Sequence, residues 1–284
     1  MQTYLEIAIG APEHQREILI ASMVEMGCES FQETESDLLC YINRDRLPGE
    51  AYERFQADLR SLLATISSNA TVRFRDIAGE NWNEQWERTI RPIEVGRQFV
   101  VKPSWAEYDN VQGRLILQID PKMSFGTGYH ETTRLMLALL ERHVIAGSVV
   151  LDVGTGTGIL AIASVKLGAR SAVGIDNDPW SIENAEENVA ANGVAGAVSI
   201  RNAALDQFAD SSTDLIVANL TLNTNLSMLG EFRRILVPGG MLLLSGLLLN
   251  DEGGMSDGLL RHQFLAADRM VEHEWIALVG SKPR

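Results

Sequence analysis

Two loops rich in glycine and threonine lie close together in the sequence and could bind a small ligand. The first is Phe125-Gly126-Thr127-Gly128, and the second is Gly154-Thr155-Gly156-Thr157-Gly158. The second loop follows the apolar run 149–153 and precedes a helical pattern that begins at Ile159. Such a loop can hold a ligand against its backbone only where side chains do not intervene, and glycine meets that condition. The layout therefore predicts a site for a cofactor of the nucleotide type.

The spacing of the glycines distinguishes between two cofactors. Dinucleotide-binding loops usually read G-x-G-x-x-G, because the amino end of the helix must receive a pyrophosphate. Here the glycines read G-x-G-x-G, and Ile159 stands where the third dinucleotide glycine would fall. S-adenosylmethionine (SAM) has no pyrophosphate but does carry a ribose. Asp176, at the end of the next apolar run, offers a carboxylate that can accept hydrogen bonds from both ribose hydroxyls. The spacing favours SAM over NAD.

Asn219 ends another predicted strand and is the candidate catalytic residue. Methyl transfer from a sulfonium is an in-line displacement, so the acceptor amine needs a free lone pair. Deprotonating a lysine at pH 7 costs about 4–5 kcal/mol, given its solution pKa of about 10.4. The amide oxygen of Asn219 can orient the neutral amine, although a turn residue at a strand end is the alternative. His130 could accept a proton or be structural, and Thr133 could bind cofactor or cap a helix.

Composition limits the classes of partner. The chain has 284 residues and a net charge of −14, which disfavours a direct nucleic acid substrate and favours a basic protein. The longest apolar run, 241–249, is interrupted by Ser245 and is too short to span a membrane. The first residues lack an export signal, so we expect a cytoplasmic protein with free thiols at Cys28 and Cys40. No Cys/His spacing indicates a metal site.

The chain reads as two domains joined by a linker. Residues 1–76 show the order β-α-β-β-α-β, which predicts a ferredoxin-like α+β domain. Residues 77–104 form the linker, where Trp82 and Trp86 share one face of a short helix. Residues 105–284 alternate apolar strands with helices and predict a doubly wound, Rossmann-like parallel sheet. The predicted strands of that domain are 115–119, 149–153, 172–176, 197–200, 215–220, 241–245 and 274–279, and a late helix is predicted at 257–267.

Three segments together resemble the ribosomal protein L-eleven methyltransferases of the PrmA type. They are DPKMSFGTGYHETT at 120–133, LDVGTGTGILA at 151–161 and GIDND at 174–178. The linker sequences NWNEQW at 81–86 and VKPSW at 101–105 also match. The resemblance covers almost the whole chain and is weakest in residues 1–76. The first segment is specific to the family, whereas many SAM enzymes share the second.

The resemblance implies SAM-dependent methylation of amino groups, on lysine side chains and the N-terminal amine, of a large-subunit ribosomal protein. By motif position, Thr133, Gly154, Asp176 and Asn219 would contact the cofactor. The ferredoxin-like domain would grip the substrate, free or on the ribosomal subunit. An alternative keeps the SAM site but assigns another protein or a small-molecule amine as acceptor. Tyr129, Glu131 and the residues after Asn219 depart from the common pattern.

Overall fold

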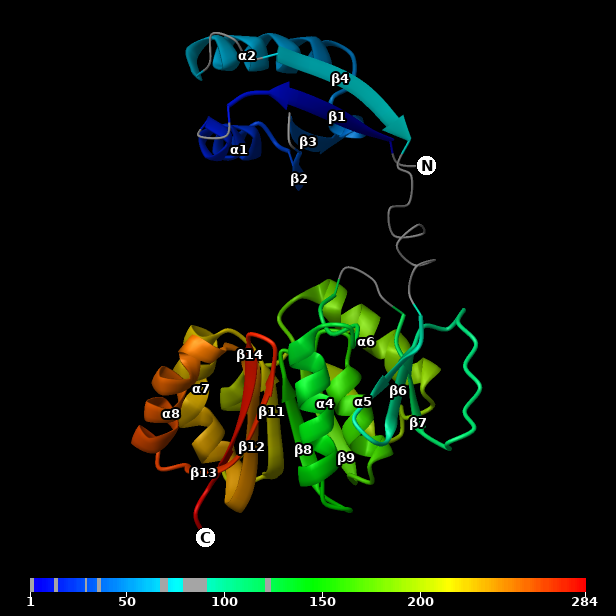
Figure 1. The fold of residues 1–284 in the computed structure, drawn as a ribbon, viewed down its shortest axis with the longest axis vertical. Helices are drawn as coiled ribbons and strands as arrows, with labels where there is room; N and C mark the ends of the chain where they lie inside the picture. The colour runs from blue at the N-terminus through cyan, green and yellow to red at the C-terminus, as the bar shows by residue number, and fades with distance from the viewer. Residues whose placement is uncertain are drawn as a thin grey trace. The chain divides into compact units, whose positions relative to one another are not determined.

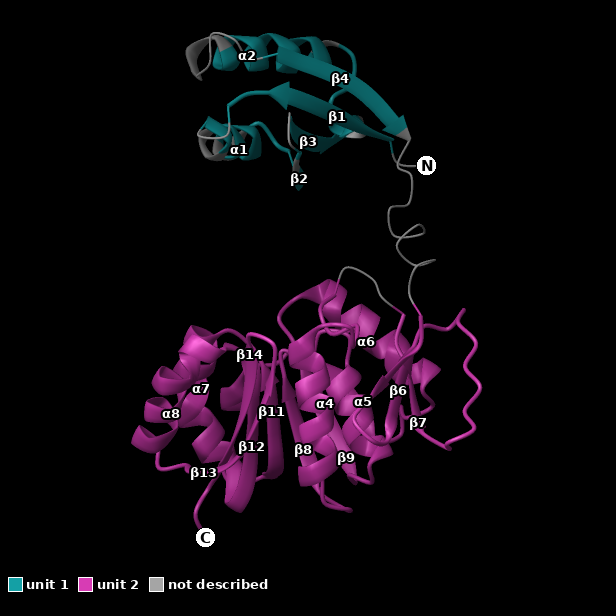
Figure 2. Ribbon diagram, viewed as in Figure 1, with its two compact units in different colours: residues 1–88 teal, residues 89–284 magenta. Residues whose placement is uncertain are grey.

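The computed structural model describes residues 3–12, 15–28, 30–34, 37–66, 71–78, 91–120 and 124–284. The chain divides into two compact units, residues 1–88 and 89–284 (Figure 2). The division falls within residues 77–104, the segment expected to connect two domains. The short helix expected around Trp82 and Trp86 lies outside the described residues.

Unit 1 consists of a four-stranded antiparallel sheet and two helices (Figure 1). The strand order is β2-β3-β1-β4. Its elements are β1 (Thr3–Gly10), α1 (Arg16–Glu25), β2 (Ser30–Glu33), β3 (Leu38–Asn43), the short η2 (Arg44–Arg46), α2 (Glu50–Ile66) and β4 (Thr71–Ala78).

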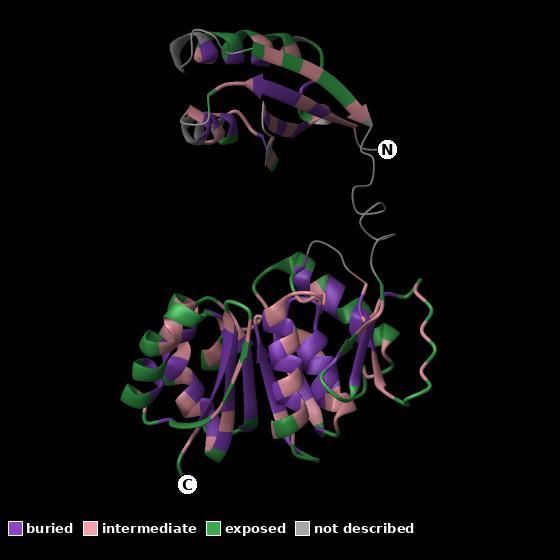
Figure 3. Ribbon diagram, viewed as in Figure 1, coloured by how far each residue is buried: buried purple, intermediate pink, exposed green. Residues whose placement is uncertain are grey.

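The core of unit 1 follows from alternation along the strands. Successive side chains of a strand point to opposite faces, so Leu5, Ile7 and Ile9 of β1 share one face and are buried (Figure 3). They belong to the same apolar cluster as Met23 of α1 and Leu59 of α2. Both helices therefore cover one face of the sheet. The two cysteines lie in the same cluster as free thiols.

Unit 2 is built on a seven-stranded mixed sheet with the order β10-β9-β8-β11-β12-β14-β13. The first five strands in this order are parallel to their neighbours, and β14 runs antiparallel between β12 and β13. The strands are β8 (Val149–Val153), β9 (Ser171–Ile175), β10 (Val198–Arg201), β11 (Thr213–Asn219), β12 (Leu236–Leu248), β13 (Leu265–Glu272) and β14 (Trp275–Ser281).

Helices cover both faces of this sheet, because its central strands are apolar on both sides. Val150 of β8 packs in the cluster that includes α4 and α5, whereas the next residue, Leu151, packs with α7 and α8. Figure 1 shows α4 and α5 apart from α7 and α8. The helices are α4 (Glu131–His143), α5 (Ile159–Lys166), α6 (Pro179–Ala191), α7 (Leu222–Ile235) and α8 (Glu252–Arg261), with the short η3 (Leu205–Gln207) and η4 (Leu249–Asp251).

The sequence order of the strands reverses at β8. From β8 the chain proceeds outward through β9 and β10, and it then returns to pair β11 with the other edge of β8. In open α/β sheets the crevice at such a switch point, beyond the carboxyl ends of the strands, is the usual ligand site. Gly154 follows β8 and Asn219 ends β11, so both lie at this crevice.

Several sequence expectations for unit 2 need correction. The strand predicted at 115–119 is β7 (Leu115–Gln118), and it pairs with β6 (Phe99–Lys102) in a separate sheet that also contains β5 (Ile93–Val95). The helix predicted at 257–267 ends at Arg261, because residues from Leu265 onward pair with β14. Pairing with β14 also extends β12 beyond residues 241–245. Of the helices in the described residues, none is both long and apolar enough to cross a membrane.

Candidate functional site

The two glycine-threonine loops are hydrogen-bonded to each other. The backbone N–H of Thr157 donates to the carbonyl of Phe125 at 3.0 Å. The side-chain hydroxyl of Thr157 donates to the carbonyl of Gly126 at 2.6 Å. Thr157 is fully buried. The first loop is therefore fastened over the second, at the carboxyl end of β8.

The glycines make this close approach possible. Gly156 has a φ of +53°, and a Cβ there would collide with the carbonyl oxygen of Phe125. A Cβ on Gly154, whose φ is +70°, would lie 2.5 Å from a methyl carbon of Leu220. L-amino acids with a side chain rarely adopt such φ values. Gly156 is therefore restricted to glycine by its backbone conformation and by the Phe125 backbone, and Gly154 mainly by its positive φ.

The backbone amides of the second loop are committed within the protein. Gly154 and Thr155 donate to the carbonyl of Ile175 at 2.9 and 3.0 Å. Gly156 donates to Asp176 at 3.0 Å, Thr157 donates to Phe125, and Gly158 donates to the carbonyl of Thr155 at 2.8 Å. The sequence predicted that these amides would face the ligand. In the structure these N–H groups all donate to acceptors within the protein.

Asp176 is half-buried beside the second loop. One carboxylate oxygen accepts the N–H of Gly156 at 3.0 Å, and the other accepts the N–H of Asp178 at 3.1 Å. Each carboxylate oxygen has a second lone pair, so both can still accept a ligand hydroxyl. Asp178 in turn caps α6, whose first residue is Pro179.

Asp152 lies beneath the second loop and was not singled out from the sequence. Its side chain is completely buried, accepts bonds from the Thr155 hydroxyl at 2.7 Å and the Ala161 N–H at 3.1 Å, and has a second oxygen with no partner among the described residues. Burial raises the pKa of Asp152 to about 7 despite those two bonds, and the charge of Asp176 adds to the rise. An acidic residue inside the apolar run 149–153 is the signal that could have identified it.

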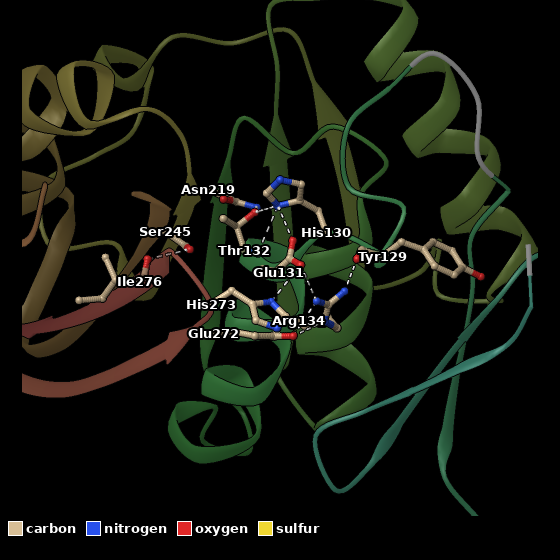
Figure 4. Close-up of polar contacts among 10 residues, drawn as sticks. All are labelled: Tyr129, His130, Glu131, Thr132, Arg134, Asn219, Ser245, Glu272, His273 and Ile276. Carbon is tan, nitrogen blue, oxygen red and sulfur yellow. Dashed lines mark hydrogen bonds and ion pairs between the residues drawn. The ribbon is translucent and has the colours of Figure 1, made fainter. Parts of the chain in front are cut away.

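A chain of polar contacts connects α4 to the end of β11 (Figure 4). Asn219 donates its side-chain N–H to Thr132 Oγ1 at 3.2 Å, and that hydroxyl lies 2.9 Å from His130 Nδ1. The same ring nitrogen accepts the N–H of Thr132 and caps α4. The amide oxygen of Asn219 is buried and has no partner in the described part of the chain. Asn219 is thus oriented by its nitrogen, and its buried oxygen is left without a hydrogen-bond donor among the described residues.

Three rings lie in a row beside this chain of contacts. The ring centroids of Phe125 and His130 are 5.3 Å apart, and those of His130 and Trp275 are 4.8 Å apart, both in edge-to-face geometry. Phe125 is 55% exposed, so the row ends at the protein surface. Trp275 begins β14, and its position at this site had no local signal in the sequence.

Arg134 joins α4 to the turn between β13 and β14 (Figure 4). Its guanidinium bonds Glu272 at 2.6 Å and the carbonyl of Tyr129, and it lies 3.2 Å from Glu131. Glu131 also lies 3.4 Å from His273. Of the two departures from the family signature, Glu131 takes part in this network through its carboxylate, whereas Tyr129 contributes only its main-chain carbonyl.

The remaining predicted residues lie around the first loop. Thr133 is buried in α4, and its hydroxyl has no partner within the described residues. Thr127 is half-buried. Gly128 packs against β6, where a Cβ would lie 2.8 Å from a methyl carbon of Val101. The structure brings the paired loops, Asp176 and Asn219 to one crevice, whereas Gly128 faces the small sheet.

Sequence reasoning also missed a row of asparagines along α6, of which Asn184 and Asn188 are buried and Asn192, the C-cap, is half-buried. Asn188 donates to the carbonyl of Thr157 at 2.9 Å and accepts the N–H of Asp120 at 3.2 Å. Asn192 both donates to and accepts from the backbone of Gln118, at 2.7 and 3.0 Å. Their spacing of four residues, repeated at Asn184, was the available signal. Across the described residues, no group of His, Cys, Asp and Glu could hold a metal ion.

Comparison with known proteins gives one consistent result. Residues 3–283 match the family model described as ribosomal protein L11 methyltransferase (PrmA). A ribosomal protein L11 methyltransferase of Chlorobaculum parvum is 37% identical, over 98% of this chain and 97% of its own. Another, of Geobacillus kaustophilus, is 32% identical over 95% of this chain and 87% of its own.

A solved structure is similar as well. The ribosomal protein L11 methylase of Lactobacillus delbrueckii subsp. bulgaricus superposes with a TM-score of 0.64 and is 32% identical. The match covers 69% of this chain and all of that one. Family and fold therefore agree.

Proposed function

Because this chain belongs to the ribosomal protein L11 methyltransferase family, we propose that it transfers methyl groups from SAM to amino groups of ribosomal protein L11. The acceptors are lysine side chains and the N-terminal amine. With a net charge of −14, the chain attracts a basic protein and repels a nucleic acid backbone. The reaction takes place in the cytoplasm, where ribosomal proteins are made, on the free protein or on the large subunit.

The proposal rests mainly on the hydrogen bonds that the N–H groups of the second loop already make within the protein. All five N–H groups of residues 154–158 already have acceptors, so the loop has no donors left for a pyrophosphate. The lack of free donors disfavours a dinucleotide, in agreement with the glycine spacing.

The residues present fit SAM. Asp176 would hold the ribose hydroxyls with its remaining lone pairs. The buried, partnerless hydroxyl of Thr133 and the paired loops at Gly126 and Gly154 would contact the rest of the cofactor. Bound SAM supplies a methyl group on a positively charged sulfur.

Asn219 would orient the acceptor amine. Its open amide oxygen accepts one N–H of the neutral amine, which aims the nitrogen lone pair away from Asn219. Thr132 holds the amide in place through its contact with the Asn219 nitrogen. No strong base is needed, because the nearby sulfonium disfavours the ammonium form.

Unit 1 would recognise the protein substrate. Its element order and its sheet order β2-β3-β1-β4 support a ferredoxin-like domain over residues 1–76. In this proposal unit 2, residues 89–284, is the methyltransferase domain. It includes β5 and β6, so the connection predicted at 77–104 ends before residue 93.

Transfer of label tests the proposal. The full chain is incubated with SAM carrying a labelled methyl group and with unmethylated ribosomal protein L11, and label on that protein is the expected result. Residues 89–284 alone should still bind SAM but lose transfer to the protein. Label on another protein or a small amine only would support the alternative acceptor and overturn this one.

A further inference from the structure

We propose that Arg134 is a positioning residue, which holds the β13–β14 turn against the first turn of α4 and so fixes Trp275 and His130 beside the acceptor position at Asn219. The inference deepens the proposed function and rests on it. Arg134 itself would not touch substrate or cofactor. Its effect would reach the site through Trp275 and His130, and Figure 4 shows the polar contacts of Arg134 and of Asn219 at the two ends of this route.

Arg134 makes contacts on both sides of this junction. Nε and Nη2 donate to the same oxygen of Glu272, at 2.9 and 2.6 Å. Nη1 donates to the carbonyl of Tyr129, the residue before the helix cap His130. The Arg134 side chain is 23% exposed, so these bonds are partly shielded from water. A planar guanidinium can serve all these partners at once, which a lysine cannot.

The turn needs such support. In the strand register Glu272 lies directly opposite Trp275, with His273 and Glu274 between them. His273 has a φ of +51°, a conformation that two-residue turns usually assign to Gly, Asn or Asp. Glu131 contacts His273 at 3.4 Å and Arg134 at 3.2 Å, so it ties the turn to α4 a second time. Fixing Glu272 therefore fixes the backbone that carries Trp275.

The contacts of Trp275 lead to Asn219, the residue that would orient the acceptor amine. Trp275 packs edge-to-face on His130, whose Nδ1 contacts Thr132, and Thr132 holds Asn219. The contacts of Arg134 named above do not include residues 154–158. Loss of Arg134 should therefore disturb the amine position more than it weakens cofactor binding.

Arg134→Met removes the charge and the donors but keeps much of the side-chain volume. We expect kcat/KM for ribosomal protein L11 to fall roughly 10- to 100-fold, because small misplacements of reacting groups cost that much. SAM affinity, measured by calorimetry, should fall by less than kcat/KM does. The kcat/KM of Arg134→Lys should lie between the values of Arg134→Met and wild type. The matched control is Arg142→Met, on the same helix, which removes an ion pair to Asp268 of the same strand β13.

A double-mutant cycle separates positioning from general stability. If Arg134 acts through Trp275, then Arg134→Met should lower kcat/KM only slightly when Trp275→Ala is already present. Independent sites would instead give losses of transition-state free energy that add. Additive losses, or a fall in SAM affinity that matches the fall in kcat/KM, would overturn the proposal.

A readout without turnover keeps the inference distinct from the proposed function. The indole N–H signal of Trp275, assigned by its loss in Trp275→Phe, should shift or broaden in Arg134→Met but not in Arg142→Met. An unchanged Trp275 signal in Arg134→Met would contradict the positioning role, whether or not the enzyme methylates its substrate. Absence of transfer by the wild type would instead refute the proposed function.

Discussion

The hydroxyl of Thr157 donates a hydrogen bond of 2.6 Å to the carbonyl of Gly126, and this bond joins two loops 31 residues apart. Both loops carry glycines with positive φ, so neither holds its shape by side-chain packing alone. The Thr157 side chain is fully buried at the carboxyl end of β8, whereas Gly126 is half-buried. We conclude that the two loops form a single structural unit.

Thr157→Val should weaken cofactor binding by loosening this junction. The substitution keeps the branched shape and removes the hydroxyl, which costs about 1 kcal/mol of stability for the lost bond. Calorimetric titration with SAM should show reduced affinity. Ser212→Ala is the control, since it removes a similar hydroxyl-to-carbonyl bond of 2.7 Å in an exposed loop. Equal SAM affinity in Thr157→Val and wild type would contradict a joint role for the loops.

Asp176→Ala should reduce SAM affinity strongly. Hydrogen bonds to a charged group contribute about 1.5–3 kcal/mol each, and the carboxylate is expected to accept two from the ribose. Asp176→Asn retains one acceptor oxygen and should lose less. Asp257→Ala, which removes an exposed carboxylate from α8, should bind SAM as wild type does. Unchanged affinity in Asp176→Ala would mean that the ribose binds elsewhere.

Asn219→Ala should lower kcat by roughly 10- to 100-fold, since the acceptor amine loses its orienting oxygen. Asn219→Asp should move the pH–rate profile to higher pH, because a carboxylate next to the amine stabilises its ammonium form. Asn223 is exposed and lies in the first turn of α7, close to Asn219 in the sequence, so Asn223→Ala serves as the control. Steady-state kinetics over a pH series measure both effects. An unshifted profile in Asn219→Asp would remove Asn219 from contact with the amine.

Asp152 should make the stability of the protein depend on pH. Its pKa is about 7 in the folded protein and near 3.8 in the unfolded chain, so the folded state binds the proton more tightly. The free energy of unfolding therefore falls as pH rises between these two pKa values, by about 1.4 kcal/mol per pH unit at most, and is level above the folded pKa.

Asp152→Asn should remove that dependence. Its amide oxygen can accept the same bonds from Thr155 and Ala161 and carries no charge to desolvate. Urea unfolding at about pH 5 and about pH 8 should show a smaller difference for the variant than for wild type. An equal pH dependence in both proteins would show that Asp152 is not the group responsible.

Much of unit 2 could be predicted because its signals are local. The apolar run 149–153 is bounded by glycine and coincides with β8, and Asp178-Pro179 marks the start of α6. The family resemblance read from residues 120–133 and 151–161 is confirmed by the match over 3–283. Strands as short as β5 and β6 show no recognisable alternation of apolar residues. The sequence therefore predicts a linker where residues 93–102 form a sheet with β7.

The contacts that complete the site could not be predicted. Arg134 and Glu272 are 138 residues apart, and no local property of either residue indicates the other. The same holds for the approach of Trp275 to His130, which depends on β14 inserting between β12 and β13. Such pairs are set by the packing of the whole sheet rather than by the neighbouring sequence.

Mass spectrometry of ribosomal protein L11 tests the central claim most directly. Unmethylated L11 is analysed before and after incubation with SAM and the full chain, with Asn219→Ala as the matched control. We predict mass increases by whole methyl groups, located on lysine side chains or the N-terminal amine, that are fast with wild type and slow with the variant. An unchanged mass of L11 with an enzyme that binds SAM would contradict the account.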